Sequence, residues 1–342
     1  MDIINLSNLQ EGKTYIGFIY LKNINIRTTK NNSQYIEITL TDGKNDITGR
    51  YFDVEKNEGI EWFKNIKDKF VCIEISIEKY NSQTNAKIIR FFWNAEKPEN
   101  ISDTFTHKSM DDSKAEEYII KLKHLISQIN DDNIRKICSY IFLEKYYNAF
   151  IVFPASKFNH HSGKYGLLEH SINIALEALA IKKIYEYIYD LDEDLLVAGA
   201  LLQDIGKIEE YLTDEHYFAE KTELYALKGH ITRSNEIFIE AAITLNIDYK
   251  IPKLQVLSNI ILSHHGKLEY GSPTLPASPE AILIAKLDNL DASLKGAIET
   301  IKKMPESEKF TKSLPHLDNC ILLNPNLYRG SNPKTDGANI LF

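Results

Sequence analysis

Residues 1–93 contain five short runs rich in β-branched and aromatic residues, which is the pattern of β-strands. In the second run apolar and polar positions alternate, and the Asp42-Gly43 pair that follows it is a strong signal for a hairpin turn. A helix is predicted over Gly59–Lys67, between the third and fourth runs. The predicted strands are Thr14–Lys22, Tyr35–Thr41, Asp46–Phe52, Phe70–Tyr80 and Ala86–Trp93. This order is that of an OB-fold, a small barrel that presents one sheet face to single-stranded nucleic acid.

From Ser113 to about Lys303 the apolar positions recur with the period of α-helices. Residues 94–112 are polar, contain a proline and show no period, which is typical of a linker. The predicted helices include Lys114–Ile129, Asp132–Phe142, Leu167–Ile181, Leu254–Ser263 and Pro279–Ile301. We therefore expect a multidomain chain: an N-terminal five-stranded OB-fold β-barrel (1–93), a linker (94–112), an all-α helical bundle (113–310) and an irregular C-terminal tail (311–342).

The stretch Leu195–Glu209 is predicted to be a buried helix that ends in a polar cluster. Gln203, Asp204 and Lys207 follow its last leucines, and Gly206 lets the backbone turn or approach a ligand closely. Helical bundles build metal or cofactor sites from polar side chains at the inner ends of their helices. The alternative is an ordinary helix C-terminus, in which Lys207 complements the helix dipole and Asp204 is solvated.

The composition is that of an ordinary globular protein, with 43% hydrophobic and 26% charged residues in a chain of 342. No run approaches the roughly 18 consecutive apolar residues of a membrane span, and no apolar leader follows Met1. Cys72, Cys138 and Cys320 are widely spaced, which indicates a reducing cytoplasm and neither a zinc ribbon nor a disulfide framework.

The net charge of −8 argues against non-specific coating of nucleic acid, but the charge is uneven. Residues 1–93 carry 13 Lys and Arg against 12 Asp and Glu, whereas the remainder carries 27 against 36. The predicted barrel is therefore the more suitable place for a polyanion. An acidic helical part is expected where several carboxylates and histidines gather around cations.

Histidines recur on the helices around the Gln203-Asp204 dyad, in a chain that has only ten of them. His170 lies on an upstream helix, His230 opens a helix after Gly229, and a histidine pair closes another helix. The full series is His170, Gln203-Asp204, His230, His264-His265, Asp288 and Asp291. Each histidine taken singly is explained by an ordinary, partly buried side chain, but the whole set with its acids is hard to assign to packing.

This series of ligand types on consecutive helices resembles the HD superfamily of metal-dependent phosphohydrolases. Local phrases resemble, more narrowly, the YhaM family of 3′→5′ exoribonucleases, over roughly Leu6 to Leu323. The phrases are GLLEHS, LLVAGALLQDIGKI, LKGHI, ILSHHGKLEYGSP and PEAILIAKLDNLDA. The resemblance implies an OB-fold at the N-terminus and two metal sites among the helices.

The resemblance also assigns the ligands. One metal would take His170, Gln203, Asp204 and Asp288, the second would take His230, His264 and His265, and Asp204 would bridge them. Lys207 would be a fixed cation beside the phosphate or the leaving group. Imidazole and carboxylate ligands without thiolates suit Mn²⁺, the expected ion, with Mg²⁺, Fe²⁺ or Co²⁺ as alternatives. Two such cations about 3.5–4 Å apart can hold a phosphate and activate water.

Gln203 departs from the family pattern, which has histidine before the aspartate. A glutamine carbonyl is a neutral, weak ligand, and its amide can donate hydrogen bonds. The first metal site should therefore be weakened, so that either two metals or only one would bind. An altered ligand shell can cost about 10–100-fold in affinity or activity without abolishing either.

Substrate contacts are expected in two places. His160 and His161, in the polar loop FNHHSGKYG, match the family's double histidine and are predicted to line the mouth of the site or to be a surface loop. On the barrel, the candidates for base stacking and backbone contact are Tyr35, Tyr51, Phe52, Lys22, Arg27 and Arg50. Barrel core is the favoured interpretation of Phe52, whereas Tyr35 and Arg50 are equally compatible with core or contact.

Three functions remain open at the level of the sequence. The first is metal-dependent 3′→5′ hydrolysis of single-stranded RNA, with single-stranded DNA as a further substrate, that releases mononucleotides. The second is a binding module that has lost catalysis through Gln203, and the third is a phosphohydrolase of small nucleotides, which would leave the barrel without a role. A homo-oligomer is compatible with the helical surfaces.

Overall fold

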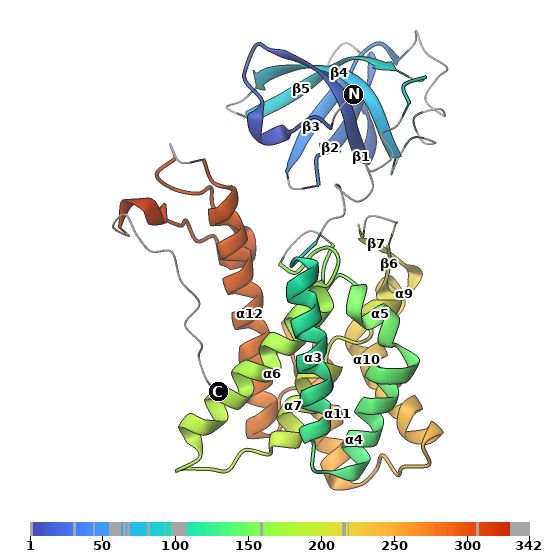
Figure 1. The fold of residues 1–342 in the computed structure, drawn as a ribbon, viewed down its shortest axis with the longest axis vertical. Helices are drawn as coiled ribbons and strands as arrows, with labels where there is room; N and C mark the ends of the chain where they lie inside the picture. The colour runs from blue at the N-terminus through green and yellow to red at the C-terminus, as the bar shows by residue number, and fades with distance from the viewer. Residues whose placement is uncertain are drawn as a thin grey trace. The chain divides into compact units, whose positions relative to one another are not determined.

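The computed structural model describes residues 3–29, 32–43, 45–54, 63, 66, 69–80, 83–92, 94–96, 108–157, 160–213, 217, 219–305 and 308–328. The chain divides into two compact units, of which the first lies within Met1–His107 and the second within Lys108–Phe342 (Figure 1). The division falls inside the segment interpreted as a linker. Among the helices described, none is both long and apolar enough to cross a membrane.

The first unit is a closed five-stranded barrel with strand order β1-β2-β3-β5-β4. All neighbours pair antiparallel except β3 and β5, which pair in parallel. The strands are β1 (Thr14–Thr28), β2 (Gln34–Thr41), β3 (Asp46–Tyr51), β4 (Lys69–Tyr80) and β5 (Gln83–Phe92). The predicted OB-like barrel is confirmed, and the helix predicted over Gly59–Lys67 lies largely outside the described residues.

The hairpin between β2 and β3 forms at the predicted Asp42-Gly43 pair. Gly43 has φ of +87°, a left-handed conformation that favours glycine, and the Asp42 side chain accepts a hydrogen bond from the Asn45 backbone at 2.7 Å. β1 continues to Thr28, six residues beyond its predicted end, because its polar second half still pairs with β2. A register shift between Leu21 and Asn23 accommodates the bend.

Two aromatic predictions for the barrel were wrong. Tyr51, a candidate for stacking, is 3% exposed and packs with Phe63 and Phe91 in the barrel core. Phe52, interpreted as core, is 49% exposed. Successive side chains of a strand point to opposite faces, so only one of these two adjacent aromatics can face the core. It is Tyr51, whereas the prediction favoured Phe52.

The second unit is a helical bundle that contains the long helices α6 and α12 (Figure 1). Asp111, Asp131, Asp192 and Ser278 cap four of its helices by accepting a backbone hydrogen bond. The main helices are α3 (Asp112–Gln128), α4 (Asp132–Ser139), α5 (Tyr147–Val152), α6 (Gly166–Tyr185), α7 (Glu193–Leu202), α8 (Lys207–Glu210), α9 (Glu223–Leu227), α10 (Gly229–Thr244), α11 (Pro252–Ser263) and α12 (Pro279–Lys303).

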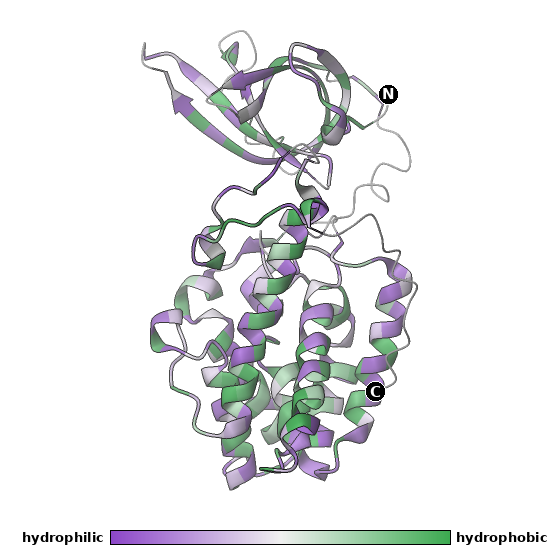
Figure 2. Ribbon diagram, turned by 90° about the vertical axis from the view of Figure 1, so that its left-hand side faces the viewer, coloured by the Kyte–Doolittle hydropathy of each residue, from purple (hydrophilic) through white to green (hydrophobic). Residues whose placement is uncertain are grey.

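The apolar faces of these helices form one core. α7 is the most apolar element and is buried from Asp194 to Leu202, as its sequence predicts. Figure 2 shows apolar residues on the helix faces within the bundle and polar residues outside. The buried apolar residues of α7 end at Leu202, and the polar residues Gln203 and Asp204 of the dyad follow directly.

The helical pattern is interrupted at three points, of which the sequence predicted one, the polar loop that contains His160 and His161. The segment predicted as one helix over Asp132–Phe142 divides into α4 and a π-helical stretch, Tyr140–Lys145. Residues 153–157 and 160–165 lie outside the helices and precede α6. A two-stranded ribbon of β6 (Tyr211–Thr213) and β7 (Ala219–Lys221) follows α8. These short elements carry too few residues for a clear hydrophobic period.

Candidate metal centre

The seven predicted metal ligands come together in the helical unit, although they span more than one hundred positions of the sequence. Asp204 is completely buried, and histidine nitrogens lie near both of its carboxylate oxygens. The set consists of His170 on α6, Gln203 and Asp204 after α7, His230 on α10, His264 and His265 after α11, and Asp288 on α12.

Each carboxylate oxygen of Asp204 faces a different half of this cluster. Asp204 Oδ2 lies 3.2 Å from His170 Nε2, and Oδ1 lies 3.4 Å from His230 Nε2 and 3.5 Å from His264 Nε2. One carboxylate therefore lies between two groups of ligand atoms. This is the geometry that a bridging carboxylate requires.

The first half of the cluster is rich in carboxylates. His170, Asp204 and Asp288 place one ligand atom each within 4.8 Å of the others, and His170 Nε2 lies 3.1 Å from Asp288 Oδ1. Gln203 donates its amide to the same Asp288 oxygen at 3.3 Å. Burial raises the pKa of Asp288, but the hydrogen bond with His170 and the charges of His264 and His170 together outweigh burial and lower the pKa to about 2.

The second half consists of His230, His264 and His265, whose ligand atoms also lie within 4.8 Å of one another. In each ring Nδ1 is already used. His264 and His265 donate to the carbonyls of Ile261 (2.7 Å) and Tyr270 (2.8 Å), and His230 donates to Glu210 (3.1 Å). This fixes the tautomer in which Nε2 carries the lone pair. Burial, together with His264 next to it, lowers the pKa of His265 to about 4, so this ring is neutral at pH 7.

Several buried lone pairs of the cluster have no hydrogen-bond partner within the described part of the chain. They belong to Gln203 Oε1, Asp204 Oδ1, His230 Nε2 and His264 Nε2. Unpaired buried polar atoms are costly, and four at one place call for a positive charge. Oxygen and imidazole-nitrogen donors without thiolates suit a divalent cation such as Mn²⁺. The residues present therefore fit a metal centre.

Lys207, at the start of α8, is the cation beside this centre. Its Nζ lies 2.7 Å from Asp204 Oδ2, and the residue is only 9% exposed. Burial alone would raise the pKa of Asp204 and lower that of Lys207. Their attraction outweighs burial, so that the pKa of Asp204 lies well below, and that of Lys207 above, the usual value.

Gly206 has a role different from the one predicted. Its φ is −63°, which any residue adopts, and no ligand is needed to explain it. A Cβ at this position would lie 2.4 Å from the His230 carbonyl oxygen and 2.7 Å from the Ser234 backbone nitrogen. The glycine therefore allows α8 to pack directly against α10, which places Lys207 and His230 around Asp204.

The two histidines of the loop before α6 occupy different environments. His161 is fully buried, and its ring lies between Glu169 and Asp291 at 3.0 and 2.7 Å. This position differs from the predicted place at the mouth of the site. The ring centroid of His160 lies 6.3 Å from that of His170, compared with 5.2 Å for His161. Burial lowers the pKa of His160 to about 3. A neutral His160 can accept or donate a hydrogen bond.

On the barrel, Tyr35 and Arg50 lie at partly exposed positions. The Tyr35 ring stacks on Phe52, with centroids 5.2 Å apart and an interplanar angle of 24°. Arg50 lies 3.6 Å from Glu37, which also pairs with Arg27 at 3.4 Å. Lys22 pairs with Asp46. The exposed Tyr35–Phe52 pair flanked by arginines is the kind of surface on which a base can stack.

Two buried or half-buried carboxylates near the centre, Glu210 and Glu169, were not predicted from the sequence. Glu210 is 2% exposed and accepts hydrogen bonds from both the ring and the backbone N–H of His230. Glu169 bonds to His161 and Lys295. Both were visible in the sequence, since Glu209-Glu210 follows Lys207 and Glu169 precedes His170. Only their burial and their hydrogen-bond partners in the structure show that these two acids, among many in the sequence, contact histidines at the centre.

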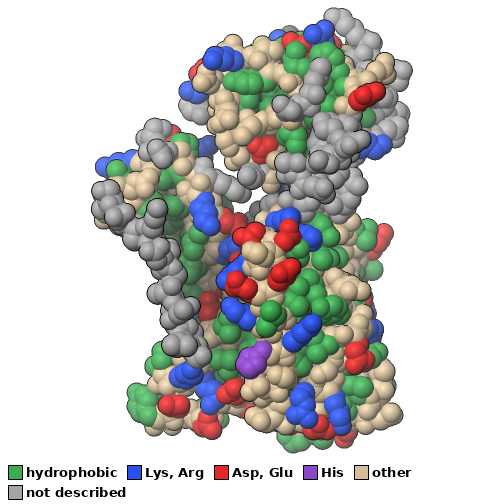
Figure 3. Space-filling model, in the orientation of Figure 1, with side chains coloured by type: hydrophobic (Ala, Val, Ile, Leu, Met, Phe, Trp, Pro, Cys, Tyr) green, Lys and Arg blue, Asp and Glu red, His purple; other side chains and the backbone are tan. Residues whose placement is uncertain are grey.

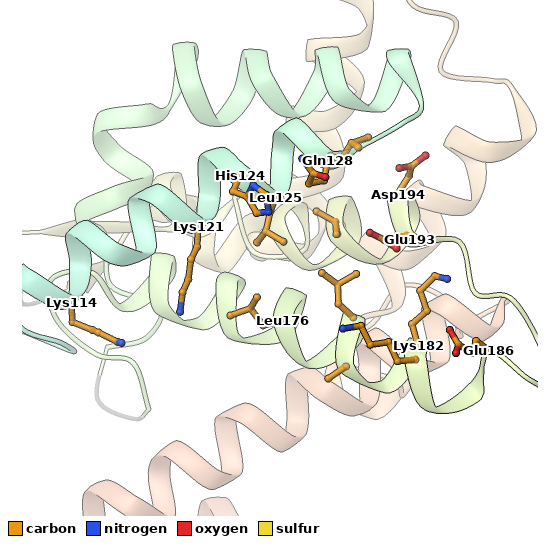
Figure 4. Close-up of a pocket in the computed structure, with 15 residues that line it drawn as sticks. Lys114, Lys121, His124, Leu125, Gln128, Leu176, Lys182, Glu186, Glu193 and Asp194 are labelled. Carbon is orange, nitrogen blue, oxygen red and sulfur yellow. The ribbon is translucent and has the colours of Figure 1, made fainter. Parts of the chain in front are cut away.

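A groove of about 950 Å³ between α3, α6 and the start of α7 is separate from the metal centre (Figure 4). Lys114, Lys121 and Lys182 line it together with Glu186 and Glu193. It contains none of the predicted metal ligands. Figure 3 likewise shows acidic and basic side chains intermingled on this face of the helical unit. The chemistry therefore belongs to the buried cluster and not to the groove.

Residues 167–293 match the model of the HD domain family, and this range contains all seven predicted ligands. The helical unit, which follows the OB-like barrel along the chain, therefore contains a segment that matches the HD domain. Over 318 residues it is 28% identical to the 3'-5' exoribonuclease YhaM of Oceanobacillus iheyensis, covering 92% of this chain and 95% of that protein. The chain is a homologue of YhaM, as the sequence motifs indicated.

Proposed function

We propose that this protein is a metal-dependent 3′→5′ exoribonuclease that shortens single-stranded RNA and releases mononucleotides. The observation that carries the proposal is the convergence of buried, unpartnered lone pairs of Gln203, Asp204, His230 and His264 around one carboxylate. Near full-length similarity to a protein named as such an enzyme, barrel included, supports RNA as the substrate. Single-stranded DNA is a further substrate that the same chemistry allows.

The protein groups have separable roles in the proposed reaction. His170, Asp204 and Asp288 would hold one cation and His230, His264 and His265 another, with Asp204 shared and Gln203 a weak oxygen ligand of the first. Divalent cations, Mn²⁺ by preference, supply positive charge that polarises the phosphodiester and lowers the pKa of an attacking water. Lys207 would stabilise negative charge beside Asp204, and His160 would hydrogen-bond the phosphate or the terminal sugar.

The barrel would bind the strand upstream of the scissile bond. The Tyr35–Phe52 stack offers an aromatic face to a base, and Arg27 and Arg50 offer positive charge to the backbone. This assignment gives the barrel a function that a phosphohydrolase of small nucleotides would not need. A cytoplasmic location and assembly into a homo-oligomer stay predictions.

The test is incubation of the purified protein with a 5′-labelled single-stranded RNA, with EDTA or with Mn²⁺, resolved on a sequencing gel. We expect a Mn²⁺-dependent ladder that shortens from the 3′ end, with mononucleotides as products. RNA with a 3′-phosphate and protein with Asp204→Asn serve as controls. Absence of any Mn²⁺-dependent shortening would contradict the proposal.

Gln203 specifically favours a second candidate, a single-strand-binding protein without catalysis. Its amide donates to Asp288 Oδ1 and thus occupies an acceptor that a cation would otherwise use. In the same experiment this function predicts RNA that is shifted on a native gel but not shortened. If the protein hydrolyses mononucleotides and added oligonucleotides do not inhibit this reaction, the result would instead indicate a small-nucleotide phosphohydrolase.

A further inference from the structure

Behind His170, on the side away from Asp204, lies a buried chain of hydrogen bonds. Asp291 Oδ2 lies 2.6 Å from His170 Nδ1 and 2.7 Å from His161 Nε2. Its other oxygen accepts a hydrogen bond from the Asn173 amide at 3.0 Å. Three donors thus converge on one carboxylate that is 5% exposed. Asp291 lies one turn after Asp288 on α12, so one helix supplies both the carboxylate beside His170 Nε2 and the one beside its Nδ1.

The chain continues through His161. Its Nδ1 lies 3.0 Å from Glu169 Oε2, while its Nε2 is bonded to Asp291. Both ring nitrogens of His161 thus face carboxylate oxygens, one on α6 and one on α12. Glu169 is held in turn by Lys295 Nζ at 2.6 and 2.7 Å and by the Ser109 hydroxyl. Each buried charge in the chain therefore has a partner of the opposite sign or a donor.

This chain determines how His170 presents its ring. With Nδ1 fixed by Asp291, only Nε2 is directed at Asp204 and Asp288. An outer carboxylate that holds a ligand histidine sets its tautomer and raises its basicity. The support matters more here than in a centre with a full set of imidazoles, because Gln203 leaves His170 as the only imidazole of the His170, Asp204 and Asp288 group.

We propose that Asp291, His161 and Glu169 are positioning residues that lock His170 in the orientation needed for its half of the metal centre. The inference deepens the proposed function, on which it rests for the identity of the centre. It also gives His161 a role other than the predicted substrate contact, since the buried His161 ring would act on the centre through Asp291.

The first readout needs neither metal nor RNA. In metal-free protein labelled with ¹⁵N-histidine, the His170 and His161 ring N–H protons bonded to Asp291 should resonate far downfield and exchange slowly with water. His170→Gln and His161→Gln assign the two signals. Asp291→Asn should remove or strongly shift both of them, and His161→Gln should shift that of His170. A His170 signal that is unchanged in Asp291→Asn overturns the proposal.

The second readout is the affinity for Mn²⁺, measured by calorimetric titration. Asp291→Asn and His161→Gln should weaken the Mn²⁺ site built on His170 by about 10–100-fold, the usual cost of losing a residue that supports a ligand. Tyr118→Phe is the matched control, because Tyr118 donates to Asn173 at 2.8 Å but does not touch Asp291. It should leave both the downfield signals and the Mn²⁺ affinity unchanged.

A purely structural role gives a different pattern. In that case the variants would lower the thermal unfolding midpoint while the folded fraction kept the wild-type affinity, and the proposal would fail. If Asp291→Asn does not fold, His161→Gln, which leaves Asp291 and its other two donors in place, decides the question. The proposed function fails separately, if wild-type protein binds Mn²⁺ but leaves RNA intact while the two readouts still behave as expected.

Discussion

The two halves of the metal centre are held by different parts of the structure. In the half formed by His230, His264 and His265, two backbone carbonyls and the carboxylate of Glu210 orient the rings. In the half formed by His170, Asp204 and Asp288, a buried chain of side chains holds a single imidazole, and Gln203 stands where a second would be.

The difference suggests how a substitution at the dyad can be tolerated. The second half depends mainly on backbone groups at the end of α11 and in the turn after it, which no single side-chain change removes. The first half depends on side chains from α6, α12 and the loop before α6. Loss of one imidazole there leaves the second half and the shared Asp204 in place. Variants that weaken Mn²⁺ binding at one half and then at the other test this comparison.

Asp204→Asn should have the largest effect, because Asp204 is common to both halves and pairs with Lys207. Loss of metal-based charge stabilisation is worth several kcal/mol, so cleavage of RNA should fall by about 10³-fold or more. Calorimetric titration should show the loss of Mn²⁺ binding at both halves. Retention of one site with wild-type affinity would show that Asp204 does not bridge.

Gln203→His should strengthen the first half alone. A neutral amide that donates to Asp288 is replaced by an imidazole whose lone pair can bind a cation, so Mn²⁺ affinity at this half should rise by about 10–100-fold. The cleavage rate should rise with it. Gln203→Asn, which keeps the amide but shortens the side chain, serves as the control. An unchanged affinity would mean that residue 203 does not contact the metal.

Glu210→Gln should weaken the second half alone, by about 10-fold in Mn²⁺ affinity. The substituted amide can still accept a hydrogen bond from His230 but no longer supplies the negative charge that raises the basicity of the ring. The matched control is Glu209→Gln, at the neighbouring position. Glu209 accepts a hydrogen bond from Arg233 at 2.7 Å and none from His230 among the described contacts. Equal effects of both variants would argue against a specific role.

Phe52→Ala should have the smallest effect and should be confined to RNA binding. Loss of one stacking face costs about 1 kcal/mol at the lower end of measured values, so the Kd for single-stranded RNA should rise about 5-fold. Ile16→Ala removes a similarly exposed apolar side chain of the barrel and should leave RNA binding unchanged. If Phe52→Ala also changed the rate at which a dinucleotide is hydrolysed, its effect would not be confined to RNA binding, and the assignment would be contradicted.

The sequence predicted the fold class because it leaves local signals, whereas the assignment of metal ligands came from the family resemblance and stays a prediction. Alternating runs and the Asp42-Gly43 turn indicate the barrel, and the apolar stretch before Gln203-Asp204 indicates a buried helix that delivers its last residues to a site. Register was not predicted at Tyr51 and Phe52, because two adjacent aromatics fit either face of a strand. The ribbon of β6 and β7 was not predicted within the helical region, because each strand is only three residues long.

By itself, the sequence determined which residues can carry the chemistry: imidazoles and carboxylates at the ends of predicted helices, with one glutamine in place of an imidazole. Only the tertiary structure decided how these residues are held. Whether His161 faces substrate or supports His170, and whether Glu210 or Glu209 orients His230, depends on burial and on partners distant in the chain. Hydrogen bonds between such partners leave no period or spacing in the sequence, because packing of α6, α8, α10 and α12 brings them together.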